Sequence, residues 1–384
     1  MPSILDQAEL RRTVELFHQN DQNVRKTAKA MGLHPSNVSR RLTAATRMGN
    51  APGHFDNGVA PGNVMGKVTI ARNKYGEIER TWERQHPDEW QHIEDLIMSR
   101  VDGVKPIDPI KAPKQFGPAQ LLNQVTIADG HVGAYAWAPE TGGPNWDLDI
   151  AHDQLLGGAT WLMDNMPDAE NLVLNILGDF LDTDGYSPLT PASKHLLDVC
   201  GRFPQIADVG ESVIEQAVLH ALKRYRHVTL VIKPGNHDPL SAYWMRKLLT
   251  RIFKNEPRVT VDPSIRPYWA MLFGKTMICS HHGDKAKMEA LPGIFAADFA
   301  EMWGQARYRI CHTGHLHHKN TILTQGKELR GMMVYQHPTL AKNNAWAADR
   351  AFNSAYELLG NTYHCGGAMP QTLHYSRELM ELAA

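Results

Sequence analysis

The sequence predicts an α/β fold in which short buried strands alternate with helices. The first observation is that five short apolar runs between residues 125 and 318 each end in a cluster of Asp, Asn or His beside a glycine. The second observation is that the segments between these runs are longer, as expected for segments that form helices. The third is the composition of the 384 residues, which are 42% hydrophobic and 21% charged. Such a chain can build one large domain and a smaller one.

Each of the five runs is rich in Val, Ile and Leu, which indicates a buried strand, and the glycine at its end permits a sharp turn. In open α/β sheets, ligands bind at the edge where the strands end. In chain order, the clusters are Asp129-Gly130-His131 after VTIA, Gly178-Asp179-Phe180-Leu181-Asp182 after NLVLNIL, Gly235-Asn236-His237-Asp238 after HVTLVI, His281-His282-Gly283-Asp284 after KTMICS, and Gly314-His315-Leu316-His317-His318 after RYRICHT. We therefore expect these five clusters to meet in one site for two metal ions.

The remaining elements predict two sheets with helices on their outer faces. The strands of the second sheet are expected in PYWAMLF, in KTMICS, and at residues 307–311, 320–324 and 332–336. The covering helices are expected near residues 149–166, 206–226 and 241–253.

Residues 1–50 differ from the rest in charge, with eight Lys or Arg against four Asp or Glu. Leu10, Val14 and Phe17 share one helical face, a second helix is expected at residues 24–31, and Gly32 ends it. A third helix is expected from Pro35 to residue 48. The spacing of small and apolar residues resembles the helix-turn-helix of bacterial DNA-binding proteins, whose third helix enters the major groove. This resemblance implies DNA contacts by Asn37, Ser39, Arg40 and Arg41. The alternative is a three-helix bundle used for dimerisation.

Residues 51–115 are expected to connect the two domains. A segment rich in Gly, Pro and Asn indicates a flexible joint, KVTIARNKYGEIERTWER predicts a β-hairpin, and a helix is expected from about residue 87 to residue 101. A second, proline-rich joint precedes the first strand of the metal-site domain. We assign no chemistry to this segment.

Composition excludes several classes of protein. The formal net charge is −1, so any attraction to nucleic acid must come from a local patch. The four cysteines lack CxxC spacing, which argues against a zinc knuckle or a disulfide framework and favours a reducing cytoplasm. No secretory signal and no membrane-spanning run is present, so a soluble cytoplasmic protein with no membrane partner is expected.

The pattern DxH, GDxxD, GNHD, HG and GHxH resembles the calcineurin-like metallophosphoesterases over roughly residues 120–340. The combination with the N-terminal helices is similar to a branch carried by bacteriophages and prophages, which would place the protein in the cytoplasm of a bacterial host. The resemblance implies a four-layer α/β/β/α sandwich, and with it a division into a helix-turn-helix domain at 1–50, a connecting segment at 51–115 and a dinuclear metallophosphoesterase domain at 116–384.

The resemblance also assigns roles to the clustered residues. It places Asp129, His131 and His317 on one metal ion, Asn236, His282 and His315 on the other, and Asp179 between them as the bridging ligand. His237 has the position of the catalytic imidazole, and Asp182 and Asp238 would orient imidazoles by hydrogen bonding. Either His281 or His282 can be the ligand of the fourth cluster, because neighbours on a strand point opposite ways. We choose His282, which directly precedes the glycine.

The mixture of imidazole, carboxylate and amide ligands suits manganese, with iron or zinc as alternatives. We have no pattern that assigns the other histidines to a site, and we expect them at the surface or satisfied in the core; they include His152, His195, His220, His312, His318 and His337. Cys279 and Cys311 are expected to be small buried residues.

These roles predict hydrolysis of a phosphoester by metal-activated attack of water on phosphorus. The leading hypothesis is a phosphodiesterase or nuclease acting on DNA that the N-terminal helices recruit. Two features depart from DNA-repair exonucleases of the superfamily: Asp182 stands where they carry His, and the tail after His318 has room only for a small cap. The alternatives are a phosphatase or small-nucleotide phosphodiesterase, and a non-catalytic DNA-binding regulator. Oligomeric state, metal identity and preferred substrate stay open.

Overall fold

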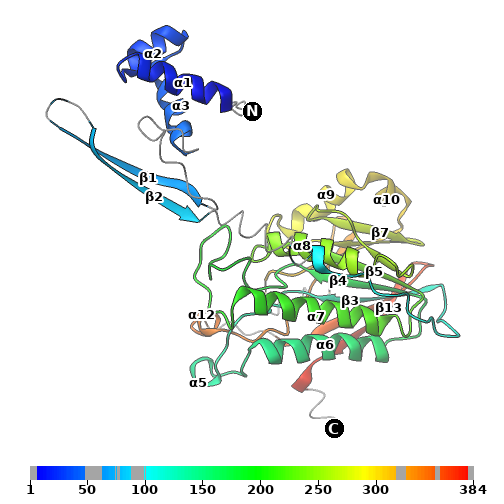
Figure 1. Cartoon of the computed structure of the whole chain (residues 1–384). Helices are drawn as coiled ribbons and strands as arrows, with labels where there is room; N and C mark the ends of the chain where they lie inside the picture. Colours follow the sequence, from blue (N-terminus) through cyan, green and yellow to red (C-terminus); the bar gives the residue numbers. More distant parts are fainter. Residues whose placement is uncertain are drawn as a thin grey trace. The chain divides into compact units, whose positions relative to one another are not determined.

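The computed structural model describes residues 7–47, 63–73, 75, 78–87, 99, 101–316, 326–350 and 355–378. The chain divides into two units, Met1–Ser99 and Arg100–Ala384. This division falls inside the segment at 51–115 that the sequence marks as a connection. The overall class is mixed α/β, with two large sheets in the second unit and helices in both units (Figure 1).

The first unit begins with the three helices expected from the sequence, α1 (Gln7–Gln19), α2 (Val24–Met31) and α3 (Pro35–Arg47). The Asn23 side chain caps α2 by accepting from two backbone amides, and Gly32 ends the helix at φ 65°, which a residue with a Cβ rarely adopts. The helices share a small core that includes Leu10, Val14 and Ala45. The apolar faces of α1 and α3 thus meet, and α2 adds the buried Thr27 and Ala28.

The predicted hairpin follows as the antiparallel pair β1 (Asn63–Arg72) and β2 (Ile78–Pro87). It contacts α3, and the Arg72 guanidinium donates to the Gln22 side chain at 3.0 Å. The hairpin is thus part of the helical unit. The helix expected at 87–101 lies mostly outside the described residues.

The larger sheet of the second unit has the strand order β13-β12-β3-β4-β5-β6. Its parallel strands are β3 (Leu121–Ile127), β4 (Asn171–Leu177), β5 (His227–Lys233) and β6 (Val259–Val261). Because the order runs in one direction, right-handed crossovers place the connecting helices on one face. These helices are α6 (Leu148–Asn165), α7 (Phe203–Ala221) and α8 (Pro239–Ile252). Their bounds lie within one to three residues of the expected ones, except that α7 ends five residues earlier than expected.

The C-terminal tail is not a cap. Its segments form β12 (Leu358–His364), which pairs antiparallel with β3, and β13 (Ala368–Tyr375), which pairs with β12. The expectation of a small cap after His318 was therefore wrong for these residues. Backbone groups on the free side of β3 need partners, and the tail supplies them by extending the sheet.

The second sheet has the order β10-β11-β9-β8-β7. Its strands are β7 (Trp269–Phe273), β8 (Thr276–Ser280), β9 (Tyr308–Thr313), β10 (Lys327–Leu329) and β11 (Met332–Gln336). Four of the five expected segments are present. The fifth, at 320–324, lies outside the described residues, and β10 pairs with β11 instead.

The two sheets pack against each other through apolar side chains from both. This cluster consists of Leu122, Val173, Val231 and Tyr363 from the larger sheet with Trp269, Ile278 and Ile310 from the smaller one. The other face of the smaller sheet is covered by α9 (Leu291–Asp298) and α10 (Ala300–Gln305), with Leu291 and Phe295 in the shared core. Further short helices include α5 (Ala138–Thr141), α12 (Ala345–Ala348) and the single turn η1 (Met288–Ala290).

Among the helices of the described residues, none is long and apolar enough to cross a membrane.

Candidate metal centre

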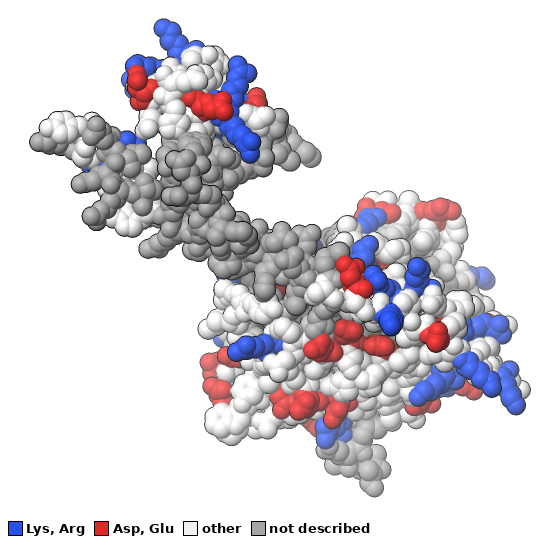
Figure 2. All heavy atoms as spheres, in the orientation of Figure 1, with Lys and Arg blue, Asp and Glu red and all other residues white. Residues whose placement is uncertain are grey.

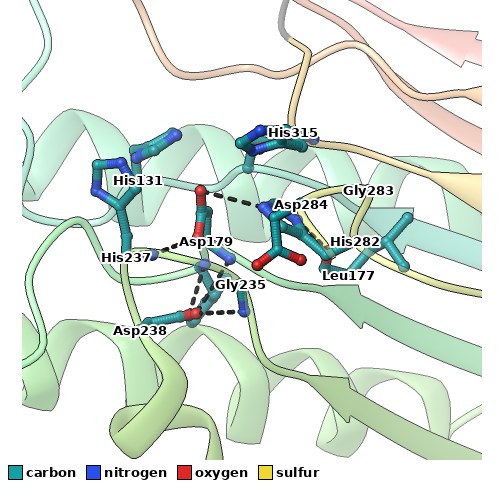
Figure 3. A network of polar contacts seen from close by, with 12 residues as sticks. His131, Leu177, Asp179, Gly235, His237, Asp238, His282, Gly283, Asp284 and His315 are labelled. Carbon is teal, nitrogen blue, oxygen red and sulfur yellow. Dashed lines mark hydrogen bonds and ion pairs between the residues drawn. The ribbon is translucent and has the colours of Figure 1, made fainter. Parts of the chain in front are cut away.

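The polar clusters that end β3, β4, β5, β8 and β9 come together at one edge of the two sheets (Figure 3). Asp129, His131, Asp179 and His315 have φ angles of 51°, 40°, 47° and 70°, in the left-handed region that residues with a Cβ seldom adopt. Four such residues in one place indicate backbone strain stored at a functional site. The surrounding sheet and glycines hold these residues in place.

Asp179 lies at the centre of the cluster and is buried, with 1% of its surface exposed. Its Oδ2 is 3.2 Å from His282 Nε2, and its Oδ1 accepts from the His237 backbone amide at 2.7 Å. Figure 3 shows the rings of His131 and His237 on one side of Asp179 and those of His282 and His315 on the other. One carboxylate is thus flanked by two pairs of imidazoles.

Three groups among the described residues have ligand atoms within 4.8 Å of one another and can hold a metal ion. The groups are His131, Asp182 and His237; Asp179, His282 and His315; and Asp129, His131 and Asp179. Asp179 belongs to the second and the third. A carboxylate shared by two ligand groups is the arrangement that a bridging ligand needs.

Hydrogen bonds fix the orientation of the imidazoles. His282 Nδ1 is 2.9 Å from the Leu177 carbonyl, and His237 Nδ1 is 2.8 Å from the Asp182 carbonyl. A carbonyl only accepts, so Nδ1 carries the hydrogen in both rings and Nε2 is left to face the site. His131 Nδ1 lies 2.8 Å from Asp182 Oδ1 in the same manner. Asp182 therefore orients two imidazoles at once.

The donor set fits divalent cations. Asn236 Oδ1 is buried without a hydrogen-bond partner, which is costly for an amide oxygen unless a cation lies against it. Glycines keep space around the carboxylates: a Cβ at Gly235 would lie 2.0 Å from Asp179 Oδ1, and one at Gly314 would lie 2.5 Å from Asp129 Oδ2. The Asp129 carboxylate also accepts from the His315 amide at 3.1 and 2.9 Å.

The electrostatics of the site favour positive charge beside Asp179. Burial raises the pKa of Asp179, but the imidazoles of His282, His237 and His131 lower it, and the net pKa lies well below the usual range. Burial lowers the pKa of His282, but Asp179 raises it, and the net pKa is about 10. With Nδ1 bonded to a carbonyl, this extra proton belongs on Nε2. A metal ion near Nε2 can replace that proton.

Asp238 was expected to orient an imidazole, but the hydrogen bonds of its carboxylate come from the backbone of the surrounding loops. Its carboxylate accepts four backbone N–H bonds of 2.8 to 3.2 Å, from Asp179, Phe180, Leu181 and Gly235. Burial raises the pKa of Asp238, and these amides oppose the shift because they favour the charged form. The residue thus ties the turn after β4 to the turn after β5.

The histidine pair at the end of β8 splits between two environments. His282 faces Asp179, whereas the His281 ring stacks on Tyr268 at 4.5 Å and its Nδ1 accepts from the Gly283 amide at 3.0 Å. Burial lowers the pKa of His281 to about 4. The alternation of side chains along the strand separates the neighbours, and only His282 belongs to the groups that can bind metal.

Most of the ligands expected from the sequence are near one another. The structure brings together Asp129, His131, Asp179, Asp182, His237, His282 and His315, and Asn236 lies between two residues that contact Asp179. His317 and His318 lie outside the described residues. His312 and His337, expected at the surface or in the core, are buried and hydrogen-bonded to each other at 2.7 Å.

Three further residues join the centre, and of these the sequence pointed only to Asp284. Asp184 accepts from the amides of Leu240 and Ser241 at 2.8 and 2.6 Å and so caps α8. Thr339 donates to the Asp129 carbonyl at 2.5 Å from a loop 210 residues away. Asp284 has both carboxylate oxygens buried and pairs with Lys285 at 2.7 Å. Only Asp284 carried a signal, since it closes the fourth cluster.

The residues expected to contact DNA lie on α3. Asn37, Ser39 and Arg40 are exposed, whereas the Arg41 side chain is largely covered and lies 3.7 Å from Glu9 of α1. On the face shown in Figure 2, basic and acidic side chains of this unit lie next to one another. Arg40 is therefore more accessible to a polyanion than Arg41.

No protein-family model and no curated protein matches the chain. Among solved structures, it is similar to a protein of Streptococcus pneumoniae TIGR4 described as conserved, uncharacterized and a predicted phosphoesterase. The two are 12% identical over 67% of this chain and 98% of the other, with a TM-score of 0.28. A TM-score of this size carries no functional inference, so the function follows from the geometry of the site.

Proposed function

We propose that this protein is a metal-dependent phosphoesterase that hydrolyses phosphodiester bonds, with DNA as its substrate. The single observation that carries the proposal is the buried Asp179 flanked by two pairs of imidazoles. Two cations bound on either side of one carboxylate are suited to bind both the attacking and the leaving oxygen of a phosphoryl transfer. A cluster with a purely structural role would need only one or two ion pairs with this carboxylate, and four imidazoles surround it.

The residues proposed to hold two divalent ions are Asp129, His131, Asp179, Asn236, His282, His315 and His317. When bound, such ions activate water and stabilise negative charge on phosphoryl oxygens. Manganese is our first choice because the set mixes imidazole nitrogens with carboxylate and amide oxygens, and iron or zinc also suits it.

His237 is proposed as the proton donor to the leaving oxygen. Its Nδ1 is committed to the Asp182 carbonyl, so the transferred proton sits on Nε2. Burial lowers the pKa of His237, but Asp179 and Asp182 raise it, and the net pKa is above the ordinary value. At neutral pH this raised pKa favours the imidazolium that a general acid requires.

The helical unit is proposed to recruit DNA through α3, as in helix-turn-helix proteins. Exposed Asn37, Ser39 and Arg40 support this proposal, and Arg41 would contribute after leaving Glu9. We further infer that the two packed sheets and their helices correspond to the four-layer α/β/β/α sandwich of the calcineurin-like superfamily, in the branch carried by phages and prophages.

The test is hydrolysis by the full chain with manganese, using bis-p-nitrophenyl phosphate, single-stranded DNA and duplex DNA. We expect all three to be cleaved. His237→Asn should lower kcat for the two DNA substrates by about 100-fold or more, because their alkoxide leaving groups need a proton and p-nitrophenolate does not. His195→Asn, at an exposed position, is the matched control and keeps full activity.

Arg40→Ala is expected to raise KM for duplex DNA more than KM for the small ester. Cleavage of the small ester without any cleavage of DNA would leave a phosphatase or small-nucleotide phosphodiesterase as the function. Absence of hydrolysis of every ester, with DNA binding intact, would favour the non-catalytic regulator.

A further inference from the structure

A pocket of about 560 Å³ opens beside the candidate metal centre. Gly283, Gly314 and His315 line this pocket, and the same segments carry the imidazoles of His282 and His315 that face Asp179. A phosphoryl group bound at the centre would therefore place one of its ester substituents at the mouth of the pocket. The side chains that line the pocket then determine which substituent binds there.

Three lysines give the pocket its charge. They are Lys285, Lys287 and Lys327, all exposed, against the two carboxylates of Asp284 and Glu289. Lys285 is held by Asp284 at 2.7 Å, which neutralises that carboxylate next to the site.

The other two lysines remain available to a ligand. Lys327 lies 3.7 Å from Glu289, with 45% and 66% of the side chains exposed, and such solvent-exposed pairs are weak. Lys287 forms no ion pair with the residues that the structure describes. Lys287 and Lys327 can therefore turn toward an anionic group.

The rest of the wall is apolar. Met288 and Leu316 line the pocket, and 44% of the Leu316 surface is exposed. A thioether packs favourably against aromatic rings and adapts to their shape. An apolar wall between cationic side chains matches a ligand that joins a flat ring to phosphate groups.

We propose that this pocket binds the nucleoside next to the scissile phosphate, with its base on Met288 and Leu316 and its further phosphate at Lys287 and Lys327. The inference rests on the proposed phosphoesterase function and names its substrate class, a nucleotide phosphodiester. Phosphoserine, phosphothreonine and sugar phosphates offer no planar ring for the apolar wall, and phosphotyrosine offers no second phosphate for the lysines.

Three chromogenic esters with one leaving group test the inference on the full chain with manganese. They are methyl p-nitrophenyl phosphate, the p-nitrophenyl ester of thymidine 5′-phosphate, and the same ester with an added 3′-phosphate. In each, a water oxygen bonds to phosphorus, the bond to p-nitrophenolate breaks, and the water's protons pass to solvent. We expect kcat/KM to rise about tenfold with the nucleoside and about tenfold again with the 3′-phosphate.

The variants separate the two parts of the pocket. Met288→Ala should reduce the gain from the nucleoside, and Lys287→Ala with Lys327→Ala should reduce the gain from the 3′-phosphate, each by about tenfold relative to methyl p-nitrophenyl phosphate. Lys254→Ala, an exposed lysine on another surface, should leave all three values unchanged. Each variant's own rate with methyl p-nitrophenyl phosphate shows that it has folded.

Equal kcat/KM for the three esters, or variants that lower all three equally, would overturn the pocket assignment while the phosphoesterase function stands. Release of p-nitrophenolate from none of them by the wild-type protein would overturn the proposed function and this inference with it.

Discussion

At the scale of single residues, Asp238 shows how one carboxylate organises two turns. Each of its oxygens accepts two backbone N–H bonds: Oδ1 from Asp179 and Gly235, and Oδ2 from Phe180 and Leu181. The residue lies directly after His237, so it fixes the backbone of the proposed proton donor as well as that of the shared ligand. Its contribution to the site is positional.

Asp238→Asn is expected to destabilise the protein by at least about 2 kcal/mol. The amide nitrogen cannot accept, so two buried N–H groups lose their partners, at about 1–3 kcal/mol each. Urea unfolding of this variant and of Asp153→Asn, an exposed control on α6, measures the difference. A change below about 0.5 kcal/mol for Asp238→Asn would show that the four bonds are not needed.

A second residue-scale feature is a buried chain of three side chains between the sheets. His312 Nδ1 is 2.7 Å from His337 Nε2, and His312 Nε2 is 2.6 Å from the Tyr363 hydroxyl. Burial lowers the pKa of His337 to about 3, and burial also lowers the pKa of His312 well below its ordinary value. Both rings are therefore neutral in the folded protein.

These neutral histidines predict loss of stability in acid. The unfolded chain binds protons on both rings below about pH 6.5, and the folded chain does not, so stability falls as pH drops from there toward 3. His337→Gln keeps a hydrogen-bonding side chain and should reduce the slope of unfolding free energy against pH by about 1.4 kcal/mol per pH unit. Chemical denaturation between pH 4 and 6, with His195→Gln as the exposed control, tests this; an unaltered slope would contradict it.

At the scale of elements, α6 carries two adjacent glycines with different surroundings. A Cβ at Gly157 would meet nothing within 4 Å, whereas one at Gly158 would lie 2.8 Å from the Tyr375 ring and 2.9 Å from Leu358. The second glycine therefore allows α6 to approach β12 and β13 closely. This is the same pair of strands that the tail adds to the larger sheet.

Gly157→Ala is expected to stabilise the protein by about 0.5–1 kcal/mol, because alanine lowers the entropy of the unfolded chain and the helical site is open. Gly158→Ala is expected to destabilise it by about 1–3 kcal/mol through overpacking against the strands. Thermal unfolding of the two variants compares neighbouring positions on one helix. Equal melting temperatures would mean that the helix shifts freely over the sheet.

The pattern of residues was sufficient to predict several strands and helices. The apolar runs before each polar cluster became β3, β4, β5, β8 and β9, and the expected helices appeared between them. The cap of α8 was beyond such reasoning, because Asp238 occupies the N-cap position while Asp184, from the loop after β4, makes the hydrogen bonds. Capping by a distant residue leaves no local signature.

At the scale of the whole molecule, the buried carboxylates of the candidate centre link metal binding to stability. Asp129 and Asp179 are each 1% exposed and Asp182 is 3% exposed, so their negative charges are costly without cations nearby. An ion that binds only the folded state stabilises it by mass action.

Manganese at about 100 times its dissociation constant is therefore expected to raise the melting temperature by roughly 5 °C over protein kept in chelator. Asp179→Asn should remove most of this increase, since it changes the shared ligand. Asp108→Asn, at an exposed position, should retain it. Thermal unfolding with and without manganese measures the change in melting temperature. An equal increase in both variants would show that the metal binds away from Asp179.

The sequence by itself determined the five strands that end in polar clusters, the helices α6, α7 and α8, and the polar residues that end those strands, because periodicity and glycine placement are local properties of the chain. Only the tertiary structure decided that His282 and not His281 faces Asp179, that the tail completes the larger sheet, and that Asp184, Asp284 and Thr339 join the centre. The physical reason is that these outcomes depend on contacts between residues far apart in the chain. The local pattern of residues determines which face of a strand a side chain occupies. The packing of the two sheets determines which other side chains it contacts.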